Sequence, residues 1–178
     1  MPSPAKRVAH NDIFFYTCPM DHKPPASIAL ESLGIPHRVF THEQPVSSFE
    51  EAASQRGQRP GQIVRSILFN IRAGEYVMVL VAGPDQVDWR KLRQHVKRSR
   101  VRMASEQEVL EVTGFRVGTV SPCGVRNQVN VLIDASVLKE AEVSIGSGVR
   151  NTAVILQSAD LRRALPDSEI VHLLETDG

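Results

Sequence analysis

IVRSILFNIRAGEYVMVLVA, residues 63–82, is the stretch that decides the fold. Residues 63–71 and 76–82 are two runs rich in β-branched residues, and the loop Arg-Ala-Gly-Glu separates them. Two such runs joined by a short loop that contains glycine are typical of a β-hairpin. The sequence therefore predicts two central antiparallel strands.

Towards the N-terminus, the residue pattern predicts a short amphipathic helix over residues 28–33 and a strand over residues 37–41. A second helix is expected over residues 49–55, because serines precede glutamates there at the spacing of a capping box. Gly57 suits the end of this helix.

Beyond the hairpin, strands are expected over residues 100–103, 129–133, 143–145 and 152–156. Helices are expected over residues 89–96, from residue 105 to about residue 114, and over residues 158–164. Strands outnumber helices, and the helices are interspersed irregularly. This order favours an α+β domain with a largely antiparallel, curved or barrel-like mixed sheet and surrounding helices over a doubly wound fold.

The 178 residues suffice for one domain with a buried core. Residues 1–25 hold five prolines and one short aromatic run, so we expect an extended leader there. The domain itself is expected over residues 26–165. Residues 166–178 are expected to form a C-terminal tail.

Lys and Arg number 21 and Asp and Glu number 20, and this balance argues against a protein that binds polyanions through its net charge. Positive charge is instead concentrated over residues 89–102, where no acidic residue occurs. Such a patch suits phosphates, although a solvated helix face has the same composition. The candidate phosphate contacts are Arg90, Lys91, Arg93, Lys97 and Arg98.

Cys18 and Cys123 are too few for a disulfide framework, and the N-terminus lacks the apolar stretch of a signal peptide. No run approaches the ~20 apolar residues of a membrane-spanning helix. We therefore expect a cytoplasmic protein. Cys18 and His22 lack the second ligand pair of a structural zinc site, so no metal is expected. No cofactor is expected either.

Small residues gather in two segments, Gly118-Thr119-Val120-Ser121-Pro122-Cys123-Gly124 and Gly146-Ser147-Gly148. Glycine accepts φ > 0 and lets a ligand approach the main chain, while proline fixes the adjoining turn. Such loops can present N–H groups to a carbonyl or a phosphate. Gly-x-x-x-Pro by itself also occurs in ordinary turns, so the surrounding residues must decide.

Seven segments in order over residues 26–165 resemble the YbaK and prolyl-tRNA synthetase editing-domain family of aminoacyl-tRNA deacylases. They are His42 to Val46, Ile63 to Phe69, Val87-Asp88 with Lys91-Leu92, Ala104-Ser105 through Thr113-Gly114, Gly118 to Gly124, Ile133-Asp134, and Gly146 to Gly148. One position departs from the family pattern. The family strand usually reads Val-Val-Lys-Thr-Leu-Leu, and this chain has Arg65 in place of the lysine.

The resemblance implies hydrolysis of an aminoacyl ester on tRNA, assisted by the ribose hydroxyl of the substrate. It implies that residue 65 holds the terminal nucleotide and that Gly118, Ser121 and Pro122 shape the amino-acid pocket, with Cys123 and Gly124 beside them. Ser147, between Gly146 and Gly148, is expected to donate to the ribose or to the substrate amine. The expected partners are the 3′ end of aminoacyl-tRNA, bound partly by the basic patch, and an aminoacyl-tRNA synthetase.

Several of these residues have a second interpretation. An arginine at residue 65 can anchor a phosphate but cannot act as a base, and it could also be an exposed strand residue. Cys123 and His42 could form a nucleophile pair, but Cys123 suits a pocket wall or the core better. His42 is either a structural histidine or a donor to the substrate. Asp134 either binds the substrate ammonium or caps the turn at Ser136.

The expected function is therefore a trans-editing deacylase for a small mischarged amino acid, with the proline acceptor as the usual case of the family. The alternative is a non-catalytic protein that binds a tRNA end or a nucleotide and has lost turnover together with the lysine. Release of the amino acid from mischarged tRNA separates the two.

Overall fold

The computed structural model describes residues 23–175 of the chain. Its helices are α1 (Pro25–Ser32), α2 (Phe49–Gln55), α3 (Trp89–His95), α4 (Glu106–Thr113) and α5 (Ser158–Ala164), with two short 3-10 helices, η1 (Pro60–Gln62) and η2 (Ala135–Leu138). Its strands are β1 (Arg38–Thr41), β2 (Val64–Arg72), β3 (Glu75–Ala82), β4 (Arg102–Met103), β5 (Asn130–Asp134), β6 (Glu142–Gly146), β7 (Thr152–Gln157) and β8 (Glu169–Val171).

The predicted hairpin of β2 and β3 forms the centre of a five-stranded sheet with the order β4-β2-β3-β5-β8. β4 and β2 pair with their neighbours antiparallel, whereas β5 runs parallel to both β3 and β8. The parallel pairing follows from the long connection between β3 and β5, which contains α3, β4 and α4 and brings the chain back in the same direction.

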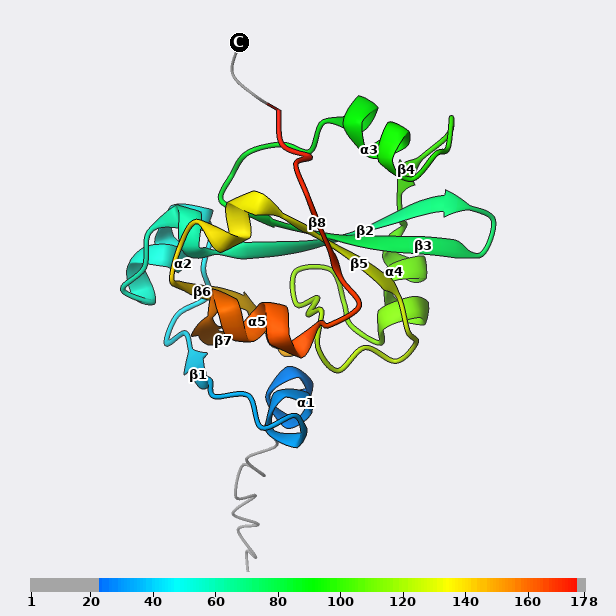
Figure 1. Ribbon diagram of the computed structural model, residues 1–178. Coiled ribbons are helices and arrows are strands. Elements are labelled where there is room, and N and C mark those ends of the chain that lie inside the picture. Colours follow the sequence, from blue (N-terminus) through cyan, green and yellow to red (C-terminus); the bar gives the residue numbers. More distant parts are fainter. Residues whose placement is uncertain (1–22, 176–178) are drawn as a thin grey trace, which may run out of the picture.

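A second sheet of three antiparallel strands has the order β1-β7-β6. A single bridge between Ile63 and Ser144 joins the start of β2 to β6. The α+β class is therefore confirmed, but the strands form two sheets rather than the barrel-like closure that was one expected form. Figure 1 shows β6, β7 and α5 on one side of the β2–β3 hairpin and α3 on the other.

Each face of the five-stranded sheet carries its own hydrophobic cluster. Val64, Leu68 and Met78 pack on the side of β6 and β7, in the larger cluster. Phe69 and Val79 pack on the side of α3, in a second cluster. Because side chains alternate along a strand, a shift by one residue changes the face on which a side chain lies.

The predicted helix starts are confirmed by their hydrogen bonds. The Ser48 Oγ accepts a hydrogen bond from the Glu51 N–H at 3.0 Å, and the Ser105 Oγ accepts one from the Glu108 N–H at 3.2 Å. The Glu108 carboxylate also receives two hydrogen bonds from Arg102, at 2.6 and 2.7 Å. Arg102, followed by the Ser105 N–H, holds the pKa of Glu108 well below its ordinary value, so this carboxylate ties α4 to β4.

The segment predicted as a C-terminal tail contains β8, which pairs with β5 as an edge strand. The Asp134 carboxylate reinforces this pairing, because its Oδ2 accepts a hydrogen bond from the Leu173 N–H at 2.6 Å. Leu173 is fully packed in the cluster beneath α3. Residues 169–174 therefore belong to the folded domain, a correction to the predicted boundary at residue 165.

The predicted leader lies mostly outside the described residues, as does Cys18. α1 begins at Pro25, the last residue of that predicted leader. Within residues 23–175, no helix combines the length and the apolar character needed to cross a membrane.

Candidate active site

A cavity of about 510 Å³ lies between α2, the first half of β2, the loop before Ser121, and the end of β6. Arg65, Gly118 and Gly146, from three segments far apart in the sequence, all contribute to its wall. Most of the remaining lining is apolar, with a few polar side chains. The other lining residues are Val46, Ser47, Ser48, Phe49, Ala52, Arg56, Ile63, Val64, Ser66, Ile67, Leu68, Met103, Ala104, Val109, Val117, Val120, Ile145 and Thr152.

The first half of β2 lines this cavity with residues from both of its faces, because β4 covers only the second half of the strand. Ser66 pairs with Leu80, and its side chain therefore lies on the face of the larger cluster. Arg65 pairs with Val81, whose side chain lies on the face of α3. The side chains of Arg65 and Ser66 thus leave the strand on opposite faces.

The Arg65 guanidinium donates a hydrogen bond from Nη2 to the carbonyl oxygen of Asp85, in the loop after β3. Its Nε is buried and has no partner within the described residues. Burial lowers the pKa of Arg65, and the nearby Asp85 carboxylate offsets part of this shift. Arg65 is therefore a partly buried cation with an unused donor, rather than an exposed strand residue.

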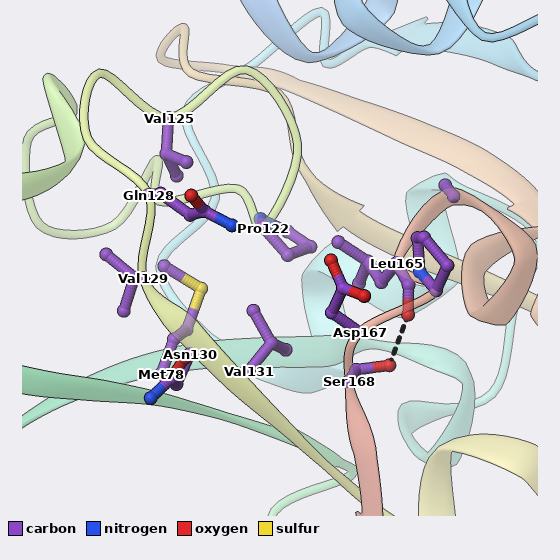
Figure 2. Close-up of a pocket in the computed structure, with 12 residues that line it drawn as sticks. Met78, Pro122, Val125, Gln128, Val129, Asn130, Val131, Leu165, Asp167 and Ser168 are labelled. Atoms are coloured by element: carbon purple, nitrogen blue, oxygen red, sulfur yellow. Dashed lines mark hydrogen bonds between the residues drawn. The ribbon is translucent and has the colours of Figure 1, made fainter.

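The loop of residues 118–124 separates the large cavity from a smaller one of about 190 Å³. Gly118 and Val120 line the large cavity, whereas Pro122 lines the small one. Figure 2 shows Pro122 in that small cavity, between Gln128 on one side and Leu165 on the other. The predicted grouping of Gly118, Ser121 and Pro122 around one ligand is therefore divided, because successive residues of this loop face different sides.

Ser121 and Cys123 are both buried between these two cavities and line neither. The Ser121 Oγ accepts a hydrogen bond from the Cys123 N–H at 3.1 Å, which closes the turn around Pro122. Burial raises the pKa of the Cys123 thiol to about 12. A thiol with this pKa is protonated at neutral pH, which agrees with a core residue and disfavours the nucleophile pair. Gly124 packs against α1, where an added Cβ would lie 2.8 Å from the Pro25 carbonyl oxygen.

The turn after β6 packs against the loop of residues 118–124, which forms part of the cavity wall. The Gly148 N–H donates a hydrogen bond to the Thr119 carbonyl at 2.9 Å, and this bond joins the turn to the loop of residues 118–124. An added Cβ on Gly146 would lie 2.1 Å from the Val120 carbonyl oxygen, so the two backbones meet there. The Ser147 hydroxyl is buried and bonded to Thr152 and to the backbone of Val149. Ser147 therefore holds the turn, and the predicted contact with substrate is not available to it.

Asp134 and His42, each with two interpretations from sequence, have structural partners. The Asp134 Oδ1 caps the turn at Ser136 through a 2.9 Å hydrogen bond, and its Oδ2 is occupied by Leu173. Asp134 is 3% exposed and is absent from the cavity wall, so it does not reach a substrate ammonium. The His42 Nδ1 donates to the Gln55 Oε1 at 2.7 Å and its Nε2 accepts from the Arg56 Nε at 3.0 Å.

The predicted basic patch lies on α3 and on the segment after it, on the side of the sheet away from β6 and β7 (Figure 1). The Lys91 ammonium donates to the Leu174 carbonyl at 2.6 Å and is half-buried, so it fixes the C-terminal segment rather than facing solvent. Arg90, Lys97 and Arg98 are exposed, and Arg98 lies 3.5 Å from Glu75. The positive segment leads directly to Met103, which lines the cavity.

Within the described residues, no group of three or more His, Cys, Asp or Glu side chains could hold a metal ion. The site instead offers backbone, two arginines and a few hydroxyls. Arg56 and Ser66 were not among the predicted site residues. In the sequence, Arg56 is only a basic residue at the end of a predicted helix, and Ser66 is only a polar position in a predicted strand.

The α+β fold carries a glycine-lined cavity with two arginines in its wall, next to a basic segment. The chain belongs to the aminoacyl-tRNA editing domain family, whose model matches residues 43–164. This match begins just after β1 and extends to the end of α5.

Two of the three similar proteins below have names that describe tRNA editing. A multifunctional Ser/Thr-tRNA deacylase, ProXp-y, from Escherichia coli (strain K12) is 29% identical over 152 residues, which are 83% of this chain and 89% of that protein. YwhH from Bacillus subtilis (strain 168), which is uncharacterized, is 31% identical over 69% of this chain and 78% of its own length. A crystal structure described as a candidate trans-editing enzyme for prolyl tRNA synthetase superposes with a TM-score of 0.78 and 27% identity, over 85% of this chain and 96% of the other.

The proline–tRNA ligase of Thermotoga maritima is 40% identical over 80 residues, which are 45% of this chain. The matched segment is 14% of that ligase. The chain thus spans a small part of the synthetase that it matches and most of the free-standing relatives.

Proposed function

We propose that this protein is a trans-editing aminoacyl-tRNA deacylase that hydrolyses the ester of a small mischarged amino acid, with tRNA-Pro as the expected acceptor. The observation that carries the proposal is the cavity of about 510 Å³, within the ~300–1,000 Å³ of typical small-molecule sites, which combines bare glycine backbone with cationic groups. The family membership and the names of the relatives support the same reaction.

The reaction needs positioning more than a strong nucleophile. A water molecule attacks the ester carbonyl, the bond between that carbon and the ribose oxygen breaks, and the proton lost by water goes to the leaving ribose oxygen. Fixed donors around the carbonyl and a held 3′ end lower the barrier, because orientation and electrostatic stabilisation require no acid or base from the protein.

Three features of the cavity suit these tasks. The Gly118 backbone is uncovered, because an added Cβ there would meet nothing within 4 Å. Ser66 lines the cavity, and its Oγ is a buried hydroxyl without a partner in the described residues, so we assign it as a donor to the water or the ribose hydroxyl once substrate is bound. Arg65, a cation in the cavity wall whose Nη2 is held by the Asp85 carbonyl, is assigned to the anchoring of the tRNA 3′ end.

The test is the release of labelled alanine, cysteine, serine and threonine from the corresponding mischarged tRNAs. We expect at least one of them to be released well above the uncatalysed rate, with correctly charged prolyl-tRNA spared. Binding of the tRNA without release of any amino acid would instead support the non-catalytic alternative. Since tRNA charging occurs in the cytoplasm, that compartment and an aminoacyl-tRNA synthetase remain the proposed location and partner.

The basic segment is proposed to contact the tRNA backbone. Changing Arg93 and Arg98 together to alanine should weaken tRNA binding several-fold and flatten its salt dependence, because each lost phosphate contact removes roughly one unit from the log–log slope. Binding measured by filter retention at several salt concentrations checks this.

Arg163→Ala is the matched control for this double variant, because Arg163 lies on α5, across the sheet from α3, and is paired with Asp160 at 2.9 Å. Hydrolysis of a minimal aminoacyl-nucleotide should be unaffected by the double variant. Equal losses on the minimal substrate and on the tRNA would contradict the electrostatic role.

A further inference from the structure

Arg56 is a second cation in the wall of the large cavity, and the sequence did not single it out. It follows the last residue of α2 and occupies the C-terminal cap of that helix. The same wall includes Ala52 and Ile63, which belong to a small buried cluster.

Two neutral groups hold the Arg56 guanidinium. Its Nε donates to the His42 Nε2 at 3.0 Å, and its Nη1 donates to the Ser144 Oγ at 2.9 Å. Because arginine can only donate, the bonded His42 nitrogen must be the unprotonated one. The other nitrogen of His42 then donates to Gln55, so the histidine is neutral and brings no counter-charge. The residue after β1, the C-terminal cap of α2 and β6 thus fix the orientation of one guanidinium.

The charge of Arg56 has no partner in the described part of the chain. None of the salt bridges over residues 23–175 involves Arg56. Its Nη2 makes no hydrogen bond within the described residues and is not a buried atom, so a ligand can reach it. Burial lowers the pKa of this guanidinium, as expected for a cation without an anion beside it. Surface arginines of the same region do have partners, since Arg59 pairs with Glu140 at 2.5 Å.

We propose that Arg56 binds the 5′-phosphate of the terminal adenosine inside the cavity, a role that rests on the proposed function of this site. A guanidinium oriented by its Nε and one Nη hydrogen presents its remaining hydrogens as a fork, and this fork matches two oxygens of a phosphate. The phosphate is the permanent anion nearest to the ester in such a substrate, whereas the amino acid brings an ammonium that Arg56 repels. The ribose and the ester are thereby directed towards Gly118 and Ser66.

A purely structural role for Arg56 makes different predictions. If the guanidinium only joins α2 to β1 and β6, its removal should lower the thermal stability and weaken all ligands equally. If it binds phosphate, its removal should weaken only ligands that carry a phosphate at that place. The discriminating quantity is therefore the ratio of the affinities for adenosine 5′-monophosphate and adenosine.

The experiment measures these two affinities by titration calorimetry with the full chain and its variants. We expect the wild type to bind adenosine 5′-monophosphate at least ~10-fold more tightly than adenosine, and Arg56→Met to reduce this preference to about twofold while its affinity for adenosine is unchanged. Arg56→Lys should keep part of the preference, since the charge remains and the fork does not. Arg59→Met, which alters an exposed arginine outside the cavity wall, should retain the full preference.

A wild type without preference for the phosphate, or an Arg56→Met variant that keeps it, overturns the proposal. If Arg56→Met does not fold, the Arg56→Lys variant decides, because an undiminished preference there shows that the fork is not used. Deacylation is measured in parallel. A preference that depends on Arg56 in a protein without deacylase activity would overturn the proposed function alone. Equal kcat/KM for wild type and Arg56→Met would overturn the role of Arg56 alone.

Discussion

Replacing Arg65 by alanine should slow deacylation of a mischarged tRNA at least ~100-fold, about 2.7 kcal/mol of transition-state stabilisation. The guanidinium is partly buried and bonded to the Asp85 carbonyl oxygen, so its place in the wall is defined before substrate binds. Loss of this anchor leaves the 3′ end free to shift, and small shifts are costly where catalysis is mostly orientation. Single-turnover hydrolysis at saturating enzyme measures the effect.

The deacylation rate of Arg65→Lys should stay within roughly tenfold of the wild-type rate, because lysine keeps the positive charge although it lacks the paired N–H donors of a guanidinium. Arg72→Ala is the matched control, since Arg72 is an exposed arginine of the same strand, paired with Glu75 at 3.4 Å. If the family lysine and the activity were lost together, the wild type would be close to background and Arg65→Lys would raise the rate. An efficient wild type that is indifferent to Arg65→Ala would contradict both interpretations and move the anchoring to Arg56.

Two glycines that line the same cavity should respond to substitution in opposite ways. Gly118→Val should leave the domain folded and abolish hydrolysis, since the added side chain would occupy open space at the cavity wall and a β-branched residue is strained at a φ of +88°. Gly146→Ala should instead destabilise the protein by about 3 kcal/mol, because its Cβ would overlap the Val120 carbonyl oxygen at 2.1 Å.

Thermal unfolding and deacylation measured on both variants separate the two effects. A loss of about 3 kcal/mol corresponds to a fall in Tm of roughly 6–12 °C for a domain of this size. Gly118→Ala, a milder change, controls for the backbone strain, because it shares the positive φ but fills less of the cavity. Normal turnover by Gly118→Val would show that the loop is an ordinary turn with no role in the reaction. An unchanged Tm for Gly146→Ala would show that the backbones of Gly146 and Val120 can move apart.

The sequence by itself determined the elements whose signals are local. The β2–β3 hairpin follows from two β-branched runs around one glycine-containing loop, and α2 and α4 begin where a serine and a glutamate stand three residues apart. The family resemblance and the glycine-rich loop were also readable, because a backbone that must accept φ > 0 needs glycine at a particular position. These features depend on residues that are neighbours in the chain.

Only the tertiary structure decided which side chains meet. β8 is three residues long and carries no strong pattern, and it is held by parallel pairing with β5 and by Asp134. The contact of Arg56 with Ser144 spans 88 positions, so no local pattern could place that guanidinium in the cavity. The loop of residues 118–124 looks uniform in sequence, but packing turned Gly118 towards the cavity and Ser121 into the core. Local propensity selects the elements, whereas the burial of their faces against one another selects the site.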